Sequence, residues 1–293
     1  MKKAKQKKHI DKTGRRIRRF GFWVSFFGTV YVLLGIIIPV KLAVQPMQAS
    51  KPVVRRREEQ REGLLVLLAG RDDQNRTAFL LVNLDAEQKS ITVAALPGET
   101  VLAGGGRDDT NNTLKKIFLS KGIKAVRREL EREDIMVDRH ALISAGGTAE
   151  LINRLGGLTV DLDEKYAALL GDKPPGMQIL SGDEGVLVFS KPADKDREQQ
   201  MGWQAQAVAS MIGNMLTANC PDNAQECFRL CVNICSTDIN VADYHRWLPV
   251  LTEIAGQPEP AAVTLTVPGE YFERDGESRF EIDQDGWDML REE

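Results

Sequence analysis

The sequence predicts an α/β protein in which a mixed central β-sheet is flanked by helices and follows one N-terminal transmembrane helix. Three observations lead to this prediction. An uncharged apolar run, residues 20–40, follows a strongly basic N-terminus. From Gly63 onward, short Val/Leu/Ile runs typical of buried strands alternate with segments of helical periodicity. No internal boundary, repeat or low-complexity tract interrupts residues 63–293, so we expect a single domain there.

Residues 1–19 form a basic tail, and residues 20–40 are predicted to be a transmembrane anchor. The tail carries ten Lys and Arg against one acid, Asp11. A spanning helix needs about 20 apolar residues, whereas the core of a cleaved signal peptide has roughly 7–15. No small-x-small cleavage site follows at the right distance, so an uncleaved anchor is preferred to a signal peptide. The positive-inside rule then places the tail in the cytoplasm and everything after the anchor outside the cell membrane.

Residues 41–62 are polar, with prolines and mixed charge, and are predicted to be a juxtamembrane linker. Because the tail holds ten of the 39 Lys and Arg and one of the 42 Asp and Glu, the rest of the chain carries 29 basic against 41 acidic residues. Affinity for phosphate chains comes from many paired cations. An acidic domain is therefore a poor general binder of nucleic acid or anionic polymer, and any phosphate must be held locally.

Three strand-like runs open the domain. The first, Leu64–Leu68, is continuously apolar and leads into the turn Gly70-Arg71-Asp72-Asp73. The third stops at the sequence ALPGET, residues 95–100. Polar groups at the ends of such strands are where α/β proteins place their sites.

The remaining elements follow from periodicity and from breaker residues. Apolar spacing within residues 113–133, broken at Gly122, predicts two helices. Further strands are predicted at 135–144, 158–162, 185–189 and 262–267. Further helices are predicted at 148–155, with Thr148 as N-cap, and at 198–216 and 241–254, and a hairpin arm with a last helix is predicted from Tyr271.

The motifs in these segments, taken in order, resemble the LytR–CpsA–Psr (LCP) family. Residues 63–100 are similar to the family's LLLGxD, R-[ST]-D-T and P-R-D-[TS] patterns. Later segments also agree with the family's motifs: residues 145–162, 180–189, 198–200 and 237–290. The resemblance therefore covers nearly all of the chain after the linker, and it implies one extracytoplasmic LCP-type domain over residues 63–293.

The resemblance implies a role in attaching glycopolymers, carried on polyprenyl pyrophosphate, to peptidoglycan. Such chemistry needs arginine forks and a divalent metal such as Mg²⁺ on carboxylates, and the lipid needs an apolar groove. Matching motif positions assigns catalytic roles to Asp72, Glu99 and Lys195, phosphate or lipid contacts to Lys191, Lys195 and Gln199, and a metal to Asp72. We expect Asp72, Glu99, Ser190 and Gln199 to converge on one mouth of the sheet. The implied partners are the membrane, the carrier-linked glycopolymer, peptidoglycan and sister LCP proteins, but not nucleic acid.

Several of the family's charged positions are replaced here. The metal-side Asp falls on Ala78, the P-R-D arginine on Gly98, and two further arginines on Ser190 and Pro192. Glu198 replaces another arginine, and losing one transition-state donor commonly costs about 10²–10³ in rate. Two hypotheses remain open. The preferred one is a protein that binds carrier lipid or polymer with weak or no catalysis, and the alternative is an active phosphotransferase with a rewired site.

The four cysteines cluster at positions 220, 227, 231 and 235. Outside the membrane, disulfides are the preferred interpretation. Buried free thiols are the alternative, because residues 227, 231 and 235 share one helical face and an i, i+4 pair is poorly placed to bridge. The spacing matches no familiar zinc finger or ribbon.

Overall fold

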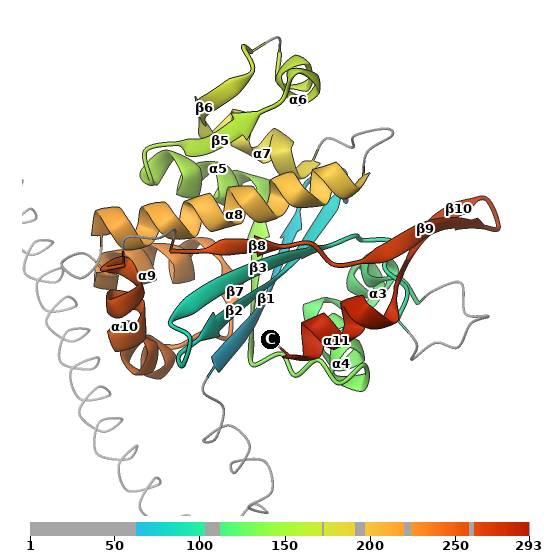
Figure 1. The fold of residues 1–293 in the computed structure, drawn as a ribbon, viewed down its shortest axis with the longest axis horizontal. Coiled ribbons are helices and arrows are strands. Elements are labelled where there is room, and N and C mark those ends of the chain that lie inside the picture. The colour runs from blue at the N-terminus through green and yellow to red at the C-terminus, as the bar shows by residue number, and fades with distance from the viewer. Residues whose placement is uncertain are drawn as a thin grey trace, which may run out of the picture. The chain divides into compact units, whose positions relative to one another are not determined.

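A six-stranded mixed sheet forms the centre of the domain (Figure 1). The computed structural model describes residues 63–102, 112–171, 173–190, 197–219, 224–257 and 261–292. The strands lie in the order β7-β4-β1-β2-β3-β8. The pairs β1–β2, β2–β3 and β4–β7 are antiparallel, whereas β1–β4 and β3–β8 are parallel. The predicted mixed sheet is therefore confirmed.

The bounds of the elements are as follows. The strands of the main sheet are β1 (Gly63–Arg71), β2 (Thr77–Asp85), β3 (Ser90–Leu96), β4 (Arg139–Ser144), β7 (Ser236–Thr237) and β8 (Val263–Leu265). Two smaller sheets pair β5 (Leu158–Leu162) with β6 (Gly176–Leu180) and β9 (Gly269–Arg274) with β10 (Glu277–Ile282). The helices are α3 (Leu114–Lys121), α4 (Ile123–Arg132), α5 (Ala145–Arg154), α6 (Glu164–Leu169), α7 (Gly182–Ser190), α8 (Arg197–Asn219), α9 (Ala224–Ile234), α10 (Val241–Ala255) and α11 (Gln284–Glu292).

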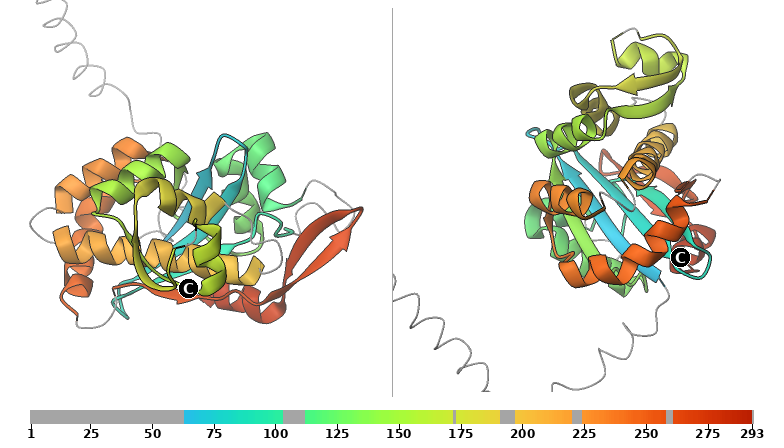
Figure 2. Two further views of the ribbon diagram at one scale, coloured as in Figure 1. Left: turned by 90° about the horizontal axis from the view of Figure 1, so that it is seen from above. Right: turned by 90° about the vertical axis from the view of Figure 1, so that its left-hand side faces the viewer.

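The central strand β1 divides its apolar side chains between two layers of helices, because successive residues of a strand point to opposite faces. On one face α3, α4 and α11 cover the sheet, and Phe118 of α3 meets Phe79 of β2 edge-on, with ring centroids 5.5 Å apart. The other face lies under α5, α7, α8 and α9. Figure 2 shows helices on both sides of the sheet. A strand buried on both faces needs apolar residues at every position, which explains the continuous apolar run of Leu64–Leu68.

The prediction of a strand at Gly185–Phe189 is wrong, because this segment lies inside helix α7. A short continuous apolar run does not by itself distinguish a buried strand from a buried helix. The deciding signal is the sequence Ser181-x-x-Glu184, in which the Glu184 carboxylate accepts a hydrogen bond from the backbone N–H of Ser181 at 2.9 Å. This contact is half of a capping box. Hydrogen bonds from Lys173 and Ser181 lower the pKa of Glu184 to about 2, so the Glu184 carboxylate is ionised near neutral pH.

Two predicted boundaries also differ. Helix α5 begins at Ala145, and its N-cap is Ser144, whose hydroxyl accepts from the N–H of Gly147 at 3.1 Å. Thr148, the predicted N-cap, instead donates its hydroxyl to the Ser144 carbonyl. Strand β4 covers only Arg139–Ser144, the second half of the strand expected at 135–144. The paired helices around Gly122, the long helix α8, and the final hairpin and helix are confirmed.

The expected tail, anchor and linker, residues 1–62, lie outside the described residues. Within the described ranges, no helix is long and apolar enough to cross a membrane.

Gly182→Ala should destabilise the domain by about 2–3 kcal/mol, through overpacking. A Cβ at this position would collide with the Ala149 carbonyl of α5 and lie 2.7 Å from Nδ2 of Asn153. The matched control is Gly213→Ala in α8, where a Cβ meets nothing within 4 Å and should be neutral or stabilising by up to about 1 kcal/mol. Urea unfolding measures both variants, and equal midpoints would contradict the close α5–α7 packing.

Candidate functional site

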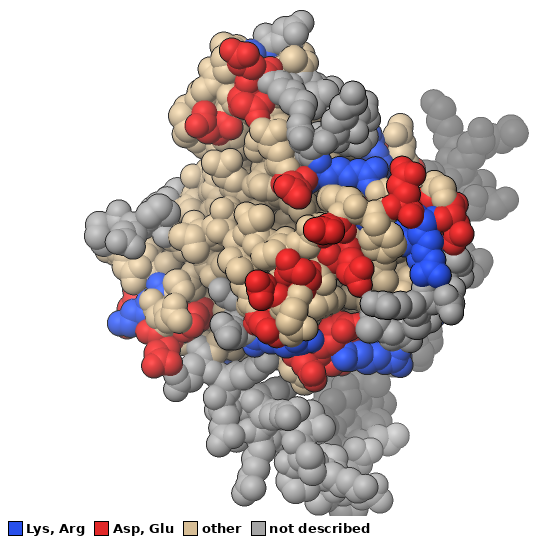
Figure 3. All heavy atoms as spheres, turned by 45° about the vertical axis from the view of Figure 1, so that its right-hand side comes forward, with Lys and Arg blue, Asp and Glu red and all other residues tan. Residues whose placement is uncertain are grey.

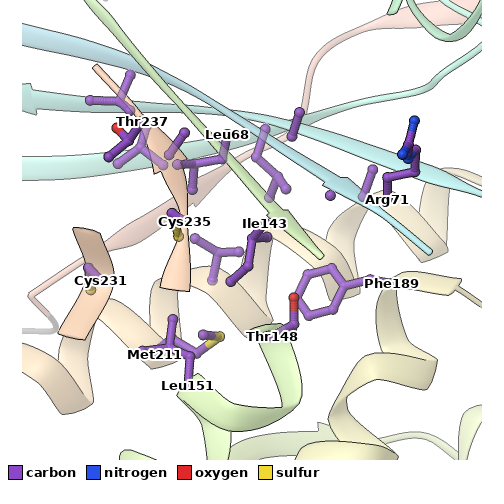
Figure 4. A pocket seen from close by; sticks show the side chains of 18 of the residues that line it. Leu68, Arg71, Ile143, Thr148, Leu151, Phe189, Met211, Cys231, Cys235 and Thr237 are labelled. Atoms are coloured by element: carbon purple, nitrogen blue, oxygen red, sulfur yellow. The ribbon is translucent and has the colours of Figure 1, made fainter. Parts of the chain in front are cut away.

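An apolar cavity of about 310 Å³ lies between the sheet and the helices α5, α7, α8 and α9. Side chains of β1, β2 and β4 form its floor, including Leu68 and Ile143, and Met211 of α8 lies opposite them (Figure 4). Arg71 and Phe189 lie toward one end, and Cys231 and Cys235 lie toward the other (Figure 4). The lining is almost wholly hydrocarbon between these ends. Its chemistry therefore suits a hydrocarbon chain.

The polar end of this cavity is the turn between β1 and β2. Asp72 Oδ1 accepts the backbone N–H groups of Gln74 at 2.9 Å and Arg76 at 2.8 Å, while Oδ2 pairs with Nε of Arg76 at 2.5 Å. Burial disfavours the charged carboxylate, but the hydrogen bonds from Arg76 outweigh it, so the pKa of Asp72 lies below its ordinary value. Asp72 is thus ionised, and its charge is already paired with Arg76.

A second cavity, of about 240 Å³, adjoins the first and is far more polar. Both cavities are lined by Arg76, Phe189 and Ser190, so they meet at the end of α7. The second cavity is also lined by Lys115 of α3, by Arg197 of α8 and by the Pro97–Glu99 turn, which follows β3. We name the first the tail cavity and the second the head cavity.

Three cations and one carboxylate line the head cavity: Arg76, Lys115, Arg197 and Glu99. The Arg197 guanidinium lies 5.2 Å from the centre of the Tyr271 ring and hydrogen-bonds to the hydroxyl of Ser278. Burial raises the pKa of Tyr271, and the charge of Glu99 adds to this, so its hydroxyl stays protonated and can donate. The cavity therefore offers a net positive charge and a neutral donor to an incoming anion.

This positive charge is local. On the face drawn in Figure 3, red acidic and blue basic side chains are interspersed, and the described part of that face shows no continuous blue field. A ligand with one anionic group fits such a distribution better than a long polyanion does.

The structure brings together three of the four side chains expected at one mouth. Asp72 and Ser190 line the tail cavity, and Glu99 and Ser190 line the head cavity. Gln199 points elsewhere: its amide hydrogen-bonds to Asp163, and it lines neither cavity. The neighbouring Gln200 lines the head cavity instead. Lys191 and Lys195 lie outside the described residues.

Motif matching missed the cations that the fold gathers here: Arg71, Arg76, Lys115 and Arg197. Arg76 carried a usable signal, because it occupies the first position of R-[ST]-D-T. Arg197 stands one position before the Glu198 that was compared with an arginine. Lys115 carried no local signal, since only the packing of α3 against the β3 turn brings it to the cavity.

Cys227, Cys231 and Cys235 form no disulfide in the structure, so the preferred disulfide interpretation is wrong for these three. Cys220 lies outside the described residues. Cys231 and Cys235 line the tail cavity, where burial raises the pKa of Cys231 to about 12. They therefore act as small apolar side chains at neutral pH.

Asp72 does not fit a Mg²⁺ ligand as it stands, because a divalent ion would have to displace Arg76 from its carboxylate. Glu99 belongs to the head cavity and Asp72 to the tail cavity. Among the described residues, no group of three or more His, Cys, Asp or Glu side chains is arranged to hold a metal ion.

A hydrocarbon cavity beside a small cationic one, with Arg76, Phe189 and Ser190 in the lining of both, defines a site for an amphiphile with an anionic head. The family model LytR_cpsA_psr matches residues 40–293, and the chain belongs to this family. Comparison with curated proteins found no significant match.

Solved structures share the fold at low sequence identity. A putative transcription regulator from Eubacterium siraeum superposes with a TM-score of 0.64 at 16% identity, covering 79% of this chain and 90% of its own. TagT, a B. subtilis protein, bound to LIIa-WTA gives a TM-score of 0.63 at 17% identity, covering 85% and 93%. TagT with bound octaprenyl pyrophosphate gives 0.58 at 16% identity, covering 85% and 92%.

Proposed function

We propose that this protein is a membrane-anchored LCP protein of the cell envelope. It holds a glycopolymer linked to polyprenyl pyrophosphate and acts in the attachment of that polymer to peptidoglycan, with weak or no catalysis of its own. Sister LCP proteins are its proposed partners in the transfer. The observation that carries the proposal is that the tail and head cavities lie side by side and share Arg76, Phe189 and Ser190 in their linings.

The tail cavity supports a prenyl chain as the apolar part of the ligand. A cavity of 150 Å³ lined by aliphatic side chains holds one benzene molecule, and this one is about twice that size. It therefore takes roughly two to three five-carbon units of the chain next to the head. Membership of the family and the fold shared with TagT, solved with LIIa-WTA and with octaprenyl pyrophosphate, support the same class of ligand.

Weak catalysis follows from three residues that line one or both of the cavities. Ala78, Gly98 and Ser190 place a methyl group, a hydrogen and a hydroxyl where a transferase of pyrophosphate needs charged groups. Apolar burial of the tail does not depend on those groups. Ground-state binding should therefore survive while transition-state stabilisation is lost.

The alternative is an active phosphotransferase with a rewired site, and one observation favours it. Arg76, Lys115 and Arg197 all line the head cavity and could neutralise a departing phosphate. Lys191 and Lys195 would add to this charge. Asp72, Glu99 and Lys195 would then be the catalytic groups, with Mg²⁺ as cofactor.

Full-length protein should bind geranylgeranyl pyrophosphate more tightly than geranylgeraniol, with no Mg²⁺-dependent hydrolysis. Asp72→Asn keeps an oxygen for the two backbone N–H groups but removes the charge that neutralises Arg76. We expect this variant to bind the pyrophosphate several-fold more tightly, since the freed guanidinium can pair with it. Calorimetry measures the affinities, and release of phosphate measures turnover.

The matched control is Asp73→Asn, an exposed neighbour that lines neither cavity. Robust Mg²⁺-dependent hydrolysis or transfer by the unmodified protein, abolished by Asp72→Asn, would contradict the proposal of weak catalysis. It would support the alternative hypothesis of an active phosphotransferase. Failure of the unmodified protein to bind either lipid would remove both hypotheses.

The proposed topology has residues 1–19 in the cytoplasm, 20–40 across the cell membrane, 41–62 as linker and the domain outside. A reporter enzyme fused after Glu293 should be active only outside the cytoplasm, and one fused after Arg19 only inside, because the basic tail is retained. Cytoplasmic activity of the first fusion, or a mature protein beginning near Ala49, would contradict this topology.

A further inference from the structure

Gly98 lines the head cavity and has no side chain of its own to fill the space beside it. It lies in the turn after β3, which is closed by a hydrogen bond from the N–H of Thr100 to the carbonyl of Pro97 at 3.1 Å. A Cβ built on Gly98 would lie 3.3 Å from Cβ of Lys115 and 3.2 Å from Oγ1 of Thr77. The space beside Gly98 is therefore already occupied by the stem of Lys115.

Backbone contacts fix Lys115 in this position. Its own N–H donates to the Gly98 carbonyl at 2.8 Å, and the N–H of Leu114 donates to the Thr100 carbonyl at 3.0 Å. Thr113, the N-cap of α3, accepts from the N–H of Lys116. The first turn of α3 is thus joined to the β3 turn, and the Lys115 side chain begins at the cavity wall.

Lys115 also differs from the other cations of the cavity in its partners. Arg76 is paired with Asp72, and Arg197 is bonded to Ser278. No hydrogen bond or ion pair joins the ammonium of Lys115 to another described residue. An ammonium beside a cavity that has no partner among the described residues is the group most available to an incoming anion, because no pair seen there has to break.

We propose that Lys115 is the principal phosphate-binding residue of the head cavity, and that Gly98 is the residue that makes room for it. The inference rests on the proposed function, because the anion it assigns to Lys115 is the pyrophosphate of the prenyl carrier. Gly98 and Lys115 act as a pair: a side chain at 98 must displace Lys115, and a cation at either position can serve the same phosphate.

The test compares geranylgeranyl pyrophosphate, geranylgeraniol and inorganic pyrophosphate as probes on the full-length chain. Lys115→Gln should weaken binding of geranylgeranyl pyrophosphate about tenfold, the effect of one charge-assisted hydrogen bond, and leave geranylgeraniol unchanged. Lys115→Arg should retain most of the affinity. The control is Lys116→Gln, the next residue on α3, which pairs with Glu277 outside both cavities and should bind as the unmodified protein does.

A double-mutant cycle tests the pairing with Gly98. Gly98→Arg alone should lower pyrophosphate affinity and the thermal midpoint, because the arginine and Lys115 compete for one space. Combined with Lys115→Ala, the same arginine should recover most of the affinity. Additive effects of the two changes would contradict the shared space.

The outcomes separate the inference from the function on which it rests. If the unmodified protein binds geranylgeranyl pyrophosphate and Lys115→Gln binds it equally well, the assignment of Lys115 is overturned and the proposed function stands. Equal weakening of both prenyl probes would show a structural effect and overturn the assignment too. If neither prenyl probe binds the unmodified protein, the proposed function fails and the inference fails with it. Inorganic pyrophosphate binding to Lys115 without any prenyl contribution would also count against the proposed function.

Discussion

Ile143→Trp should abolish measurable binding of geranylgeranyl pyrophosphate while leaving the protein folded. Ile143 of β4 projects into the tail cavity, facing Met211 of α8 (Figure 4). The larger ring can enter the space of about 310 Å³, so the core does not have to move. Excluding one five-carbon unit costs about 3–4 kcal/mol at roughly 0.8 kcal/mol per buried carbon. The affinity should therefore fall by at least about 100-fold.

Calorimetry with the same lipid measures this effect, and urea unfolding checks the fold. Ile143→Val is the control, because it keeps the cavity open and should change the affinity by less than about tenfold. Unchanged binding by the tryptophan variant would show that the prenyl chain does not enter the tail cavity. Geranylgeraniol should lose affinity in parallel, since its hydrocarbon tail is the same.

The second large effect concerns turnover. The substitutions Ala78→Asp, Gly98→Arg and Ser190→Arg place charged groups at the site. Together they should create Mg²⁺-dependent hydrolysis of geranylgeranyl pyrophosphate. Lys115→Ala is made in the same variant, because the arginine at position 98 needs the space that the Lys115 side chain occupies. The combined variant should exceed any single change by at least about 100-fold, since each donor contributes about 10²–10³ and such groups act as a unit.

Phosphate release with and without Mg²⁺ measures the gain. The control carries Gly98→Gln in place of the arginine, which keeps the bulk and removes the charge. A single substitution that works as well as the whole set would show that the groups act independently. Robust turnover by the unmodified protein would show that Arg76, Lys115 and Arg197 already suffice.

The sheet was predictable from the sequence because its signal is local. The run Leu64–Leu68 and the polar turns around Asp72 and Glu99 mark strand ends within a few residues, and both turns do lie at the site. Helix α7 was mistaken for a strand because its apolar run is as short as a strand, and only the Ser181–Glu184 contact at its start distinguishes the two.

The cations of the head cavity were not predictable in the same way. Lys115 reaches the cavity because hydrogen bonds join α3 to the turn after β3. The residues next to Lys115 in the sequence do not predict that contact. Gln199 shows the converse, since it matches a family motif yet bonds to Asp163 away from both cavities. Motif position predicts where the backbone goes, whereas the direction of a side chain depends on tertiary packing.

Phe189 and Ser190 form a wall shared by both cavities, and this has a thermodynamic consequence. They lie at the end of α7, where Tyr166 donates to the Val188 carbonyl at 2.9 Å and Gln204 donates to the Phe189 carbonyl at 3.3 Å. A ligand part that moves this wall in one cavity changes the shape of the other, so the two halves of an amphiphile bind with a coupling free energy. That coupling is reciprocal: whatever the prenyl chain does to the affinity for phosphate, phosphate does to the affinity for the chain.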